Sequence, residues 1–238
     1  YIDKEKQSGG DSRITLPDYA IIDPNFTLSL SREVASSTAM DALSQAVESY
    51  WSINSTEDSK QIAQKAIFLL LDNLEFASNL PSGEESRRAK EQVMLAANFS
   101  GKAINLTKTT ACHSISYPLT SYFHIAHGHA ASLTLGEMFI YNSQVRNEDC
   151  ADKRGAEYVR ATLKKLTGFF GVETAERVRE KLKVLMRNIS LETKLSQLGL
   201  VERDLDFILS KAFNPQRAGN NPRVLTREGL RIILENIF

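Results

Sequence analysis

Cysteine and long hydrophobic runs are scarce in this sequence. Its 238 residues contain two cysteines, Cys112 and Cys150, which are too few for a disulfide framework in a chain of this size. The longest unbroken apolar run is 66–71, whereas a membrane-spanning helix needs roughly 20 such residues. We therefore expect a protein of the reducing cytoplasm that has no membrane span.

Net charge is absent as well. The chain has 29 Lys and Arg residues against 29 Asp and Glu residues, and no basic block interrupts their mixture. Neutralisation of phosphates by clustered Lys and Arg supplies most of the affinity of nucleic-acid-binding proteins. The sequence therefore predicts that nucleic acid is not a partner.

The first residues differ in character from the rest. The chain starts with Tyr1 rather than Met, and 1–11 is polar, so we expect the sequence to begin inside a longer protein. Two short apolar stretches, 14–16 and 19–22, are separated by Pro17-Asp18. This pattern predicts two brief strands or extended segments.

From Ser31 nearly to the C-terminus, apolar residues recur at spacings of three and four, which is the period of an amphipathic helix. This pattern predicts an all-α fold, a layered helical bundle that occupies 31–238. After a first helix that begins near Ser31, we expect helices at 59–79, 84–107, 111–122, 128–144, 152–169, 172–187, 191–198, 201–212 and 226–237.

Several local signals mark where these helices begin and end. Segments 31–34 and 54–57 are predicted helix starts, because each has a Ser or Thr placed to accept from a free amide and an acidic residue in the first turn. Segment 81–85 (Pro-Ser-Gly-Glu-Glu) breaks the helical pattern, and its Ser and second Glu fit a capping box. Gly171 and Gly199 are predicted to end helices.

All four histidines lie within seventeen residues of one another. Imidazole is a common transition-metal ligand and the usual acid-base group near neutral pH, so such clustering favours a functional site. The alternative is that each ring is a surface residue or a hydrogen-bonded core residue. The four are His113, His124, His127 and His129.

His113 and His127 are fourteen residues apart, which on one straight helix corresponds to about 21 Å. One helix therefore does not bring both rings to one ion. Pro118 and 126–128 are expected to interrupt the helix, so that each ring lies near a different helix end and the two converge. Gly128 lets the backbone pass close to a bound group.

A second candidate feature lies in the first predicted helix. Asp41 and Gln45 are four residues apart, which stacks their side chains about 5–6 Å apart on one helix face. Such a pair offers two oxygens to one cation. Glu48 is a weaker candidate, because seven residues from Asp41 is about 10 Å of rise. The alternative for Asp41 is a helix cap or a salt-bridge partner.

Asp41, His113 and His127 together form a set of one carboxylate and two imidazoles. Such a set suits Fe²⁺ or Zn²⁺ and leaves coordination positions for a substrate. A structural zinc site more often uses Cys and is closed by four protein ligands. Cys112 is interpreted as a small buried hydrophobic residue. The residue types therefore predict an open, catalytic metal site.

These motifs resemble the iron-containing (group III) alcohol dehydrogenases. The resemblance rests on 41–50 (Asp-Ala-Leu-Ser-Gln-Ala-Val-Glu-Ser-Tyr), followed by His113 and, after thirteen intervening residues, by His127-Gly128. It runs along the whole chain. Further matching segments are 16–27, 117–120, 127–130 and 221–226.

The resemblance implies a two-domain dehydrogenase, in which an N-terminal α/β half holds NAD(P) and a C-terminal helical half holds a divalent metal. This chain would be the helical half, with 1–30 as the segment that connects it to the nucleotide-binding domain and 31–238 as the catalytic domain. The family's glycine-rich pyrophosphate turn is absent from these residues. We therefore expect the isolated domain to bind nucleotide poorly and to be inactive alone.

The resemblance also implies roles for individual residues. Asp41, His113 and His127 occupy metal-ligand positions of the family. Gln45 stands where most members have a fourth ligand, His, and an amide oxygen is a weaker transition-metal ligand than imidazole. Gln45 is therefore either a weak ligand or a residue that holds a water or the substrate. Tyr117 stands where many members have another His.

Proton exchange is expected to use Tyr117, His124 or His129 through water. The implied reaction is reversible oxidation of a small alcohol to an aldehyde or ketone, with Fe²⁺ or Zn²⁺ and NAD or NADP, in a chain that is a candidate homodimer. Gln45, 117–122 and 127–130 resemble the phosphonoacetaldehyde reductase branch, although the sequence places no evident pair of arginines beside the metal motifs.

Two alternatives to the dehydrogenase remain at this point. One is a three-ligand metalloenzyme like dehydroquinate synthase or glycerol dehydrogenase, since one carboxylate and two imidazoles suit both. The other is a metal-free helical interaction module that lost its ion when His became Gln45.

Overall fold

The computed structural model describes residues 17–79, 83–213 and 215–238, and over these residues the chain is helical. The all-α prediction is confirmed: no strand forms in this part of the chain, whose only β-type pairing is an isolated bridge between Cys150 and Arg223. The helices are α2 (Arg32–Trp51), α3 (Glu57–Asn79), α4 (Glu84–Thr107), α5 (Ala111–Phe123), α6 (His127–Ser143), α7 (Ala156–Phe169), α8 (Ala175–Asn188), α9 (Glu202–Lys211), α10 (Pro215–Ala218) and α11 (Arg227–Asn236), with 3-10 turns η1 (Pro24–Thr27), η2 (Asn147–Asp149) and η3 (Ser196–Leu198).

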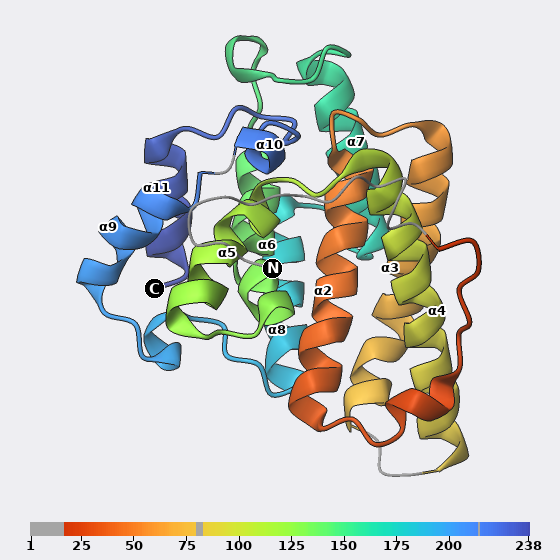
Figure 1. Cartoon of the computed structure of the whole chain (residues 1–238). Helices are drawn as coiled ribbons and strands as arrows, with labels where there is room; N and C mark the ends of the chain where they lie inside the picture. Colours follow the sequence, from red (N-terminus) through yellow and green to blue (C-terminus); the bar gives the residue numbers. More distant parts are fainter. Residues whose placement is uncertain (1–16, 80–82, 214) are drawn as a thin grey trace.

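α2 lies at the centre of the bundle and is buried on most sides. In Figure 1, α3 and α4 lie on one side of α2, and α5 and α6 lie on the other. Small residues permit this close packing: the Ser100 hydroxyl of α4 donates to the carbonyl of Ala42, 2.8 Å away. The side chain of Ser44 turns back to the carbonyl of Met40, so its hydroxyl is satisfied inside the core. α2 is therefore a rigid support for any site on its surface.

α6 forms the second support, because it packs against α2, α5, α8 and α11. Its Phe139 ring contacts Trp51 of α2 edge to face at 5.8 Å and Phe170, just after α7, at 6.3 Å between centroids. Each such fully buried side chain stabilises the fold by roughly 1.5–3 kcal/mol. These contacts fix the position of α6 relative to α2.

One expected helix is wrong. Residues 191–198 form only the short turn η3, because α8 ends at Asn188, Ser190 adopts a φ of 63° and the following backbone bonds to another segment. The amide of Leu195 donates to the carbonyl of Ile237, 2.7 Å away. Leu191 and Leu195 are buried at helical spacing without a helix. The helical spacing of these two leucines therefore reflects their burial, and an irregular segment can bury side chains at the same spacing.

The first predicted strand (14–16) and the Ser82–Glu85 capping box involve residues outside the described part. The second stretch, 19–22, forms no strand and includes Tyr19 and Ile21, which are about nine-tenths exposed. Among the described residues, no neighbouring strand offers backbone hydrogen bonds to this segment, so it does not form part of a sheet.

Other helix signals have mixed outcomes. Gly171 and Gly199 follow helical segments with φ of 66° and 86°, as predicted. Pro118 does not interrupt the chain but lies inside α5. The reversal comes instead at His124, whose φ is 57°. The helix expected from residue 152 begins only at Ala156.

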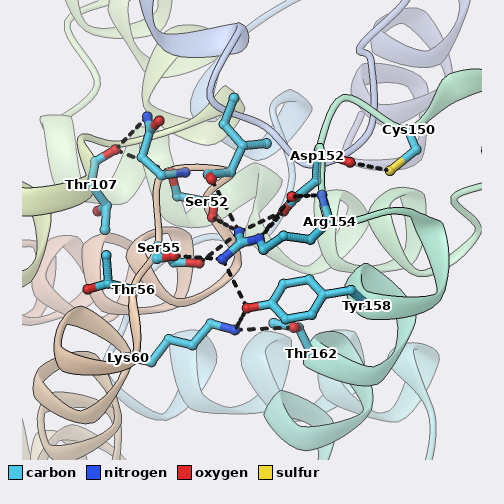
Figure 2. A network of polar contacts seen from close by, with 12 residues as sticks. Ser52, Ser55, Thr56, Lys60, Thr107, Cys150, Asp152, Arg154, Tyr158 and Thr162 are labelled. Atoms are coloured by element: carbon cyan, nitrogen blue, oxygen red, sulfur yellow. Dashed lines mark hydrogen bonds and ion pairs between the residues drawn. The ribbon is translucent and has the colours of Figure 1, made fainter.

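A fully bonded polar network explains that later start (Figure 2). The side chain of Arg154 pairs with Asp152 at 2.7 Å, and the pair lies before the helix rather than in it. Arg154 also donates to the carbonyls of Ser52 and Ser55 in the α2–α3 connection, and to the Tyr158 hydroxyl. All three guanidinium nitrogens are used. The network ties α7 to the end of α2.

Candidate metal centre

Two helix starts bring two histidines together. His113 is the third residue of α5 and His127 is the first residue of α6. The two helices pack against each other after the reversal at His124. The imidazole centroids of His113 and His127 are 5.4 Å apart. The expectation that each ring lies near a different helix end is confirmed, although Pro118 is not the cause.

Asp41 of α2 completes the cluster. Its Oδ1 lies 3.3 Å from His113 Nε2 and 3.8 Å from His127 Nε2. The three donor atoms lie within 4.8 Å of one another, close enough for one cation to contact all three. The structure thus brings together the three side chains that the sequence placed around one ion.

Two atoms of this cluster lack hydrogen-bond partners. Asp41 Oδ1 and His113 Nε2 are both buried, and neither has a hydrogen bond to any part of the described chain. Buried polar atoms are normally satisfied, and an exception calls for an explanation. A divalent cation between them supplies it, because carboxylate oxygen and imidazole nitrogen are common ligands of Zn²⁺ and Fe²⁺. These residues therefore fit a bound divalent metal.

Gly128 allows α6 to approach Asp41. A Cβ atom at this position would lie 2.1 Å from the carbonyl oxygen of Ser37 and 2.6 Å from the Asp41 Cβ atom. Because one of these neighbours is backbone, any larger residue would push α6 away from α2. The glycine is needed for close helix contact beside the donors, whereas the sequence predicted that it allows close approach to a bound group.

Glu48 contacts Nδ1 of His113, the ring nitrogen that does not face Asp41. This carboxylate is fully buried. It also accepts hydrogen bonds from the Thr110 hydroxyl at 2.7 Å and from the Cys112 amide at 2.8 Å. Trp51 Nε1 in turn donates to Thr110. Glu48 therefore caps the start of α5 and orients its first histidine.

The bond to Glu48 fixes which nitrogen of His113 is available. An ionised carboxylate only accepts, so Nδ1 carries a proton, and Nε2, which faces Asp41, is the nitrogen that can bind metal. Metal-binding histidines usually have such a partner on their other nitrogen. The sequence suggested Glu48 only as a weak ligand; its spacing of seven residues from Asp41, two helical turns on the same face, was the available signal.

The charges of this cluster are coupled. Burial pushes the pKa of His113 down, but Glu48 and Asp41 outweigh it and raise the pKa to about 9. Burial also pushes the pKa of Glu48 up, yet the His113 charge and the hydrogen bonds from His113 and Thr110 lower it overall. Without metal, His113 is thus a cation between two carboxylates. A bound cation would take the place of its Nε2 proton.

Gln45 contacts Asp41 instead of standing apart as a fourth donor. Its amide nitrogen donates to Asp41 Oδ2 at 2.8 Å. Oδ2 is thereby satisfied, and the unpartnered Oδ1 remains for the cation. This contact gives Gln45 a role that the sequence did not predict, which is to orient the carboxylate.

His127 is on the open side of the cluster. Its side chain is 40% exposed, against 2% for His113. Burial lowers its pKa, helped by the charge on His113 and opposed by Asp41, so the ring is neutral at neutral pH. The Ser116 hydroxyl gives its proton to the His113 carbonyl at 2.9 Å, so at 3.4 Å it accepts from His127 Nδ1. His127 Nε2 is then free to bind metal.

The three predicted proton carriers lie in different places. Tyr117 is beside the cluster, with its ring centroid 5.9 Å from that of His127. His129 turns away from it, because residues two apart on a helix face different directions, and its Nε2 contacts the Glu192 carbonyl at 2.7 Å. His124 is exposed at the end of α5 and makes no contact with the three donors in the described structure.

Comparison with known proteins decides the family. Residues 35–238 match the model of the Fe-containing alcohol dehydrogenase family, C-terminal. The chain belongs to this family. The resemblance seen in the sequence is therefore confirmed, and the two alternatives to a dehydrogenase are not favoured.

Iron-containing alcohol dehydrogenase relatives cover nearly the whole chain. The phosphonoacetaldehyde reductase of Streptomyces viridochromogenes is 34% identical over 218 residues, which are 92% of this chain and 53% of that protein. The NADPH-dependent butanol dehydrogenase of Clostridium saccharobutylicum is 26% identical over 232 residues, 96% of this chain and 56% of that protein. The chain thus spans about half the length of these relatives.

Solved structures of the family agree with the fold. The sulfoacetaldehyde reductase of Bifidobacterium kashiwanohense, in complex with NAD⁺, aligns with a TM-score of 0.75 and 27% identity over 90% of this chain and 53% of that one. The iron-containing alcohol dehydrogenase of Thermotoga maritima aligns with a TM-score of 0.74 and 27% identity, over 93% and 54%.

Proposed function

We propose that this chain is the metal-binding, catalytic part of an NAD(P)-dependent alcohol dehydrogenase or aldehyde reductase. One observation carries the proposal: Asp41, His113 and His127 converge within 4.8 Å, with two of their donor atoms otherwise unpartnered. Family membership gives this geometry its chemical meaning. A structural ion would more often be enclosed by four protein ligands, whereas three leave a position for substrate.

Different residues of the chain have different roles around the ion. A bound divalent metal supplies Lewis acidity that polarises an alcohol or carbonyl oxygen. Glu48 keeps His113 in the tautomer that binds metal, and Gln45 keeps Asp41 turned toward the two rings. Tyr117 keeps its proton at neutral pH, because burial raises its pKa despite the opposing charge of Arg217. We propose Tyr117 as the group that passes a proton to the substrate oxygen, directly or through water.

Hydride exchange belongs to NAD(P), which we propose is bound by the part of the protein that precedes this chain. In support, the chain covers about half of the phosphonoacetaldehyde reductase and of the butanol dehydrogenase, and one of the similar solved structures contains NAD⁺. No helix of the described residues is long and apolar enough to span a membrane. A cytoplasmic location and a homodimer remain predictions. Fe²⁺ and Zn²⁺ are both chemically suited to the donors.

The test is metal content and turnover of the whole protein. After anaerobic loading with Fe²⁺ or Zn²⁺, we expect about one equivalent of tightly bound metal and NAD(P)-dependent alcohol oxidation. Asp41→Ala and His127→Ala should each weaken metal binding by more than roughly 100-fold, because loss of an outer partner alone costs 10–100-fold. Elemental analysis and absorbance of NAD(P)H check the two results.

Matched substitutions provide the controls. Asp72→Ala changes an exposed carboxylate on α3, and His124→Ala changes an exposed histidine beyond the cluster, so both should retain the ion. A wild-type protein that takes up no ion after anaerobic loading would support the metal-free interaction module instead.

A further inference from the structure

A cationic side chain, Arg217, lies near the candidate metal centre. Arg217 belongs to α10, which packs against α5. Its guanidinium carbon lies 4.9 Å from the centroid of the Tyr117 ring. The Tyr117 ring in turn lies beside His127. Arg217, Tyr117 and His127 therefore form a row that leads from α10 to the metal donors.

The guanidinium is held in place but is not neutralised. One of its nitrogens donates to the Thr109 hydroxyl at 2.6 Å, just before α5. Among the described residues, no carboxylate pairs with Arg217. The tyrosine face orients the guanidinium plane without cancelling its charge. A half-buried arginine of this kind is ready to bind an anion through its remaining N–H groups.

The position of Arg217 places its charge on the side from which a substrate would reach the metal. His127 is the exposed ligand of the cluster, so an incoming substrate reaches the ion from the side where Tyr117 and Arg217 lie. The charge of Arg217 acts on both neighbours, since it contributes to lowering the pKa of His127 and opposes the rise for Tyr117. A molecule whose oxygen reaches the metal donors would therefore present its far end to Arg217.

We propose that Arg217 selects short aldehydes that carry a tetrahedral phosphonate or sulfonate anion at the end opposite the carbonyl group. This inference rests on the proposed function and names its substrate class. Relatives that act on phosphonoacetaldehyde and sulfoacetaldehyde are consistent with it. The fork of Arg N–H donors matches the oxygens of such an anion. Arg217, which lies over the Tyr117 ring, takes the anion-binding role for which the sequence places no pair of arginines beside the metal motifs.

Substrate discrimination by the whole, metal-loaded protein tests the proposal. Phosphonoacetaldehyde and sulfoacetaldehyde are compared with butanal, a neutral aldehyde of similar length. In Arg217→Met, kcat/KM for the two anionic aldehydes should fall roughly 10- to 100-fold, the value of a charged hydrogen bond. The value for butanal and the KM for NAD(P)H should stay within about twofold. Arg217→Lys should recover part of the loss, because it keeps the charge but not the fork.

A binding measurement gives a second readout without turnover. Calorimetry should detect 2-hydroxyethylphosphonate, the alcohol that corresponds to phosphonoacetaldehyde, on the wild-type protein and on the control Arg187→Met, which changes an exposed arginine of α8. Arg217→Met should bind it roughly 10- to 100-fold more weakly. This result would support the role of Arg217 even if no aldehyde were reduced, an outcome that would reject the proposed function alone.

Three results would overturn the inference. Equal losses for butanal and the anionic aldehydes, with a lower Tm, would make Arg217 a structural tether to Thr109. A raised KM for NAD(P)H with unchanged aldehyde preference would assign the cation to the cofactor phosphates. Unchanged binding of 2-hydroxyethylphosphonate in Arg217→Met would remove the anion site altogether.

Discussion

Two buried polar clusters of this protein differ in how completely they are bonded. The Arg154 network uses every guanidinium nitrogen and pairs the charge with Asp152 (Figure 2). The cluster of Asp41 and His113 leaves one oxygen and one nitrogen without partners in the described structure. The first lies just beyond the C-terminal end of α2, and the second lies on the surface of that helix. The contrast separates a network that joins helices from a site that is prepared for a ligand.

The two arginines show the same contrast. Arg154 has a carboxylate, three backbone carbonyls and a tyrosine hydroxyl around it. Among the described residues, Arg217 contacts one hydroxyl and one aromatic face. A cation that is already neutralised by its own chain adds stability, whereas one that is held but unpaired adds recognition. In this protein, structural and functional residues therefore differ mainly in whether their polar groups have hydrogen-bond or ion-pair partners, and less in their burial or charge.

The largest expected effect is the pH dependence of the metal-free protein. The pKa of His113 is about 9 when folded and 6.5 when unfolded, so the folded state holds this proton more tightly. The resulting stabilisation is fully present below about pH 6.5 and is lost as pH rises through about 9. Its size is on the order of 3 kcal/mol. Urea unfolding of metal-stripped protein between pH 6 and 10 measures it.

Glu48→Gln is the matched variant for this titration. It keeps the size of the side chain but removes the charge that raises the pKa of His113 most. The loss of stability above pH 7 should therefore become much smaller. An undiminished pH slope in Glu48→Gln would show that the slope arises outside the metal site.

A smaller effect is expected from the bonded network. Asp152→Ala should lower the free energy of unfolding by roughly 2–3 kcal/mol, because it leaves Arg154 among carbonyls without its counter-charge. The Arg154 side chain is 30% exposed to solvent, so the loss of stability should be smaller than for a fully buried ion pair. Metal content should not change. Chemical unfolding and elemental analysis of the same preparation check both expectations.

Asp41→Asn is the counterpart of that change. It should lower the stability of the metal-free protein by less than Asp152→Ala does, because it removes only one of the two carboxylates that raise the pKa of His113. It should nevertheless impair metal uptake. If Asp152→Ala lost the ion while Asp41→Asn lost the stability, the assignment of structural and functional clusters would be reversed.

Much of the fold was predictable because helical periodicity and local helix signals agree over long stretches. Ser31 does begin α2, accepting from the Val34 amide, and the long helices α3 and α4 end where expected. The errors arise where tertiary contacts replace local bonds. Leu195 bonds to Ile237 rather than to its own turn, and Arg154 donates to the distant carbonyls of Ser52 and Ser55 ahead of α7. Neither partner is visible from local spacing.

The site was predictable to the extent that its ligands are rare residue types at spacings that exclude other arrangements. Asp41, His113 and His127 meet this condition. Glu48 and Arg217 do not, because a single Glu in a helix or a single Arg in a turn is usually a solvated charge. Their roles depend on which side chains they face, and α5 and α10 must fold together before that is defined.

The central claim is that one divalent cation is bound jointly by Asp41, His113 and His127. A crystal of the metal-loaded whole protein, measured at the absorption edge of Zn or Fe, tests it most directly. We predict a single anomalous peak about 2.0–2.2 Å from an Asp41 oxygen and from Nε2 of both histidines, with Gln45 bonded to the carboxylate. A peak held by other residues, or none at this cluster, would contradict the account.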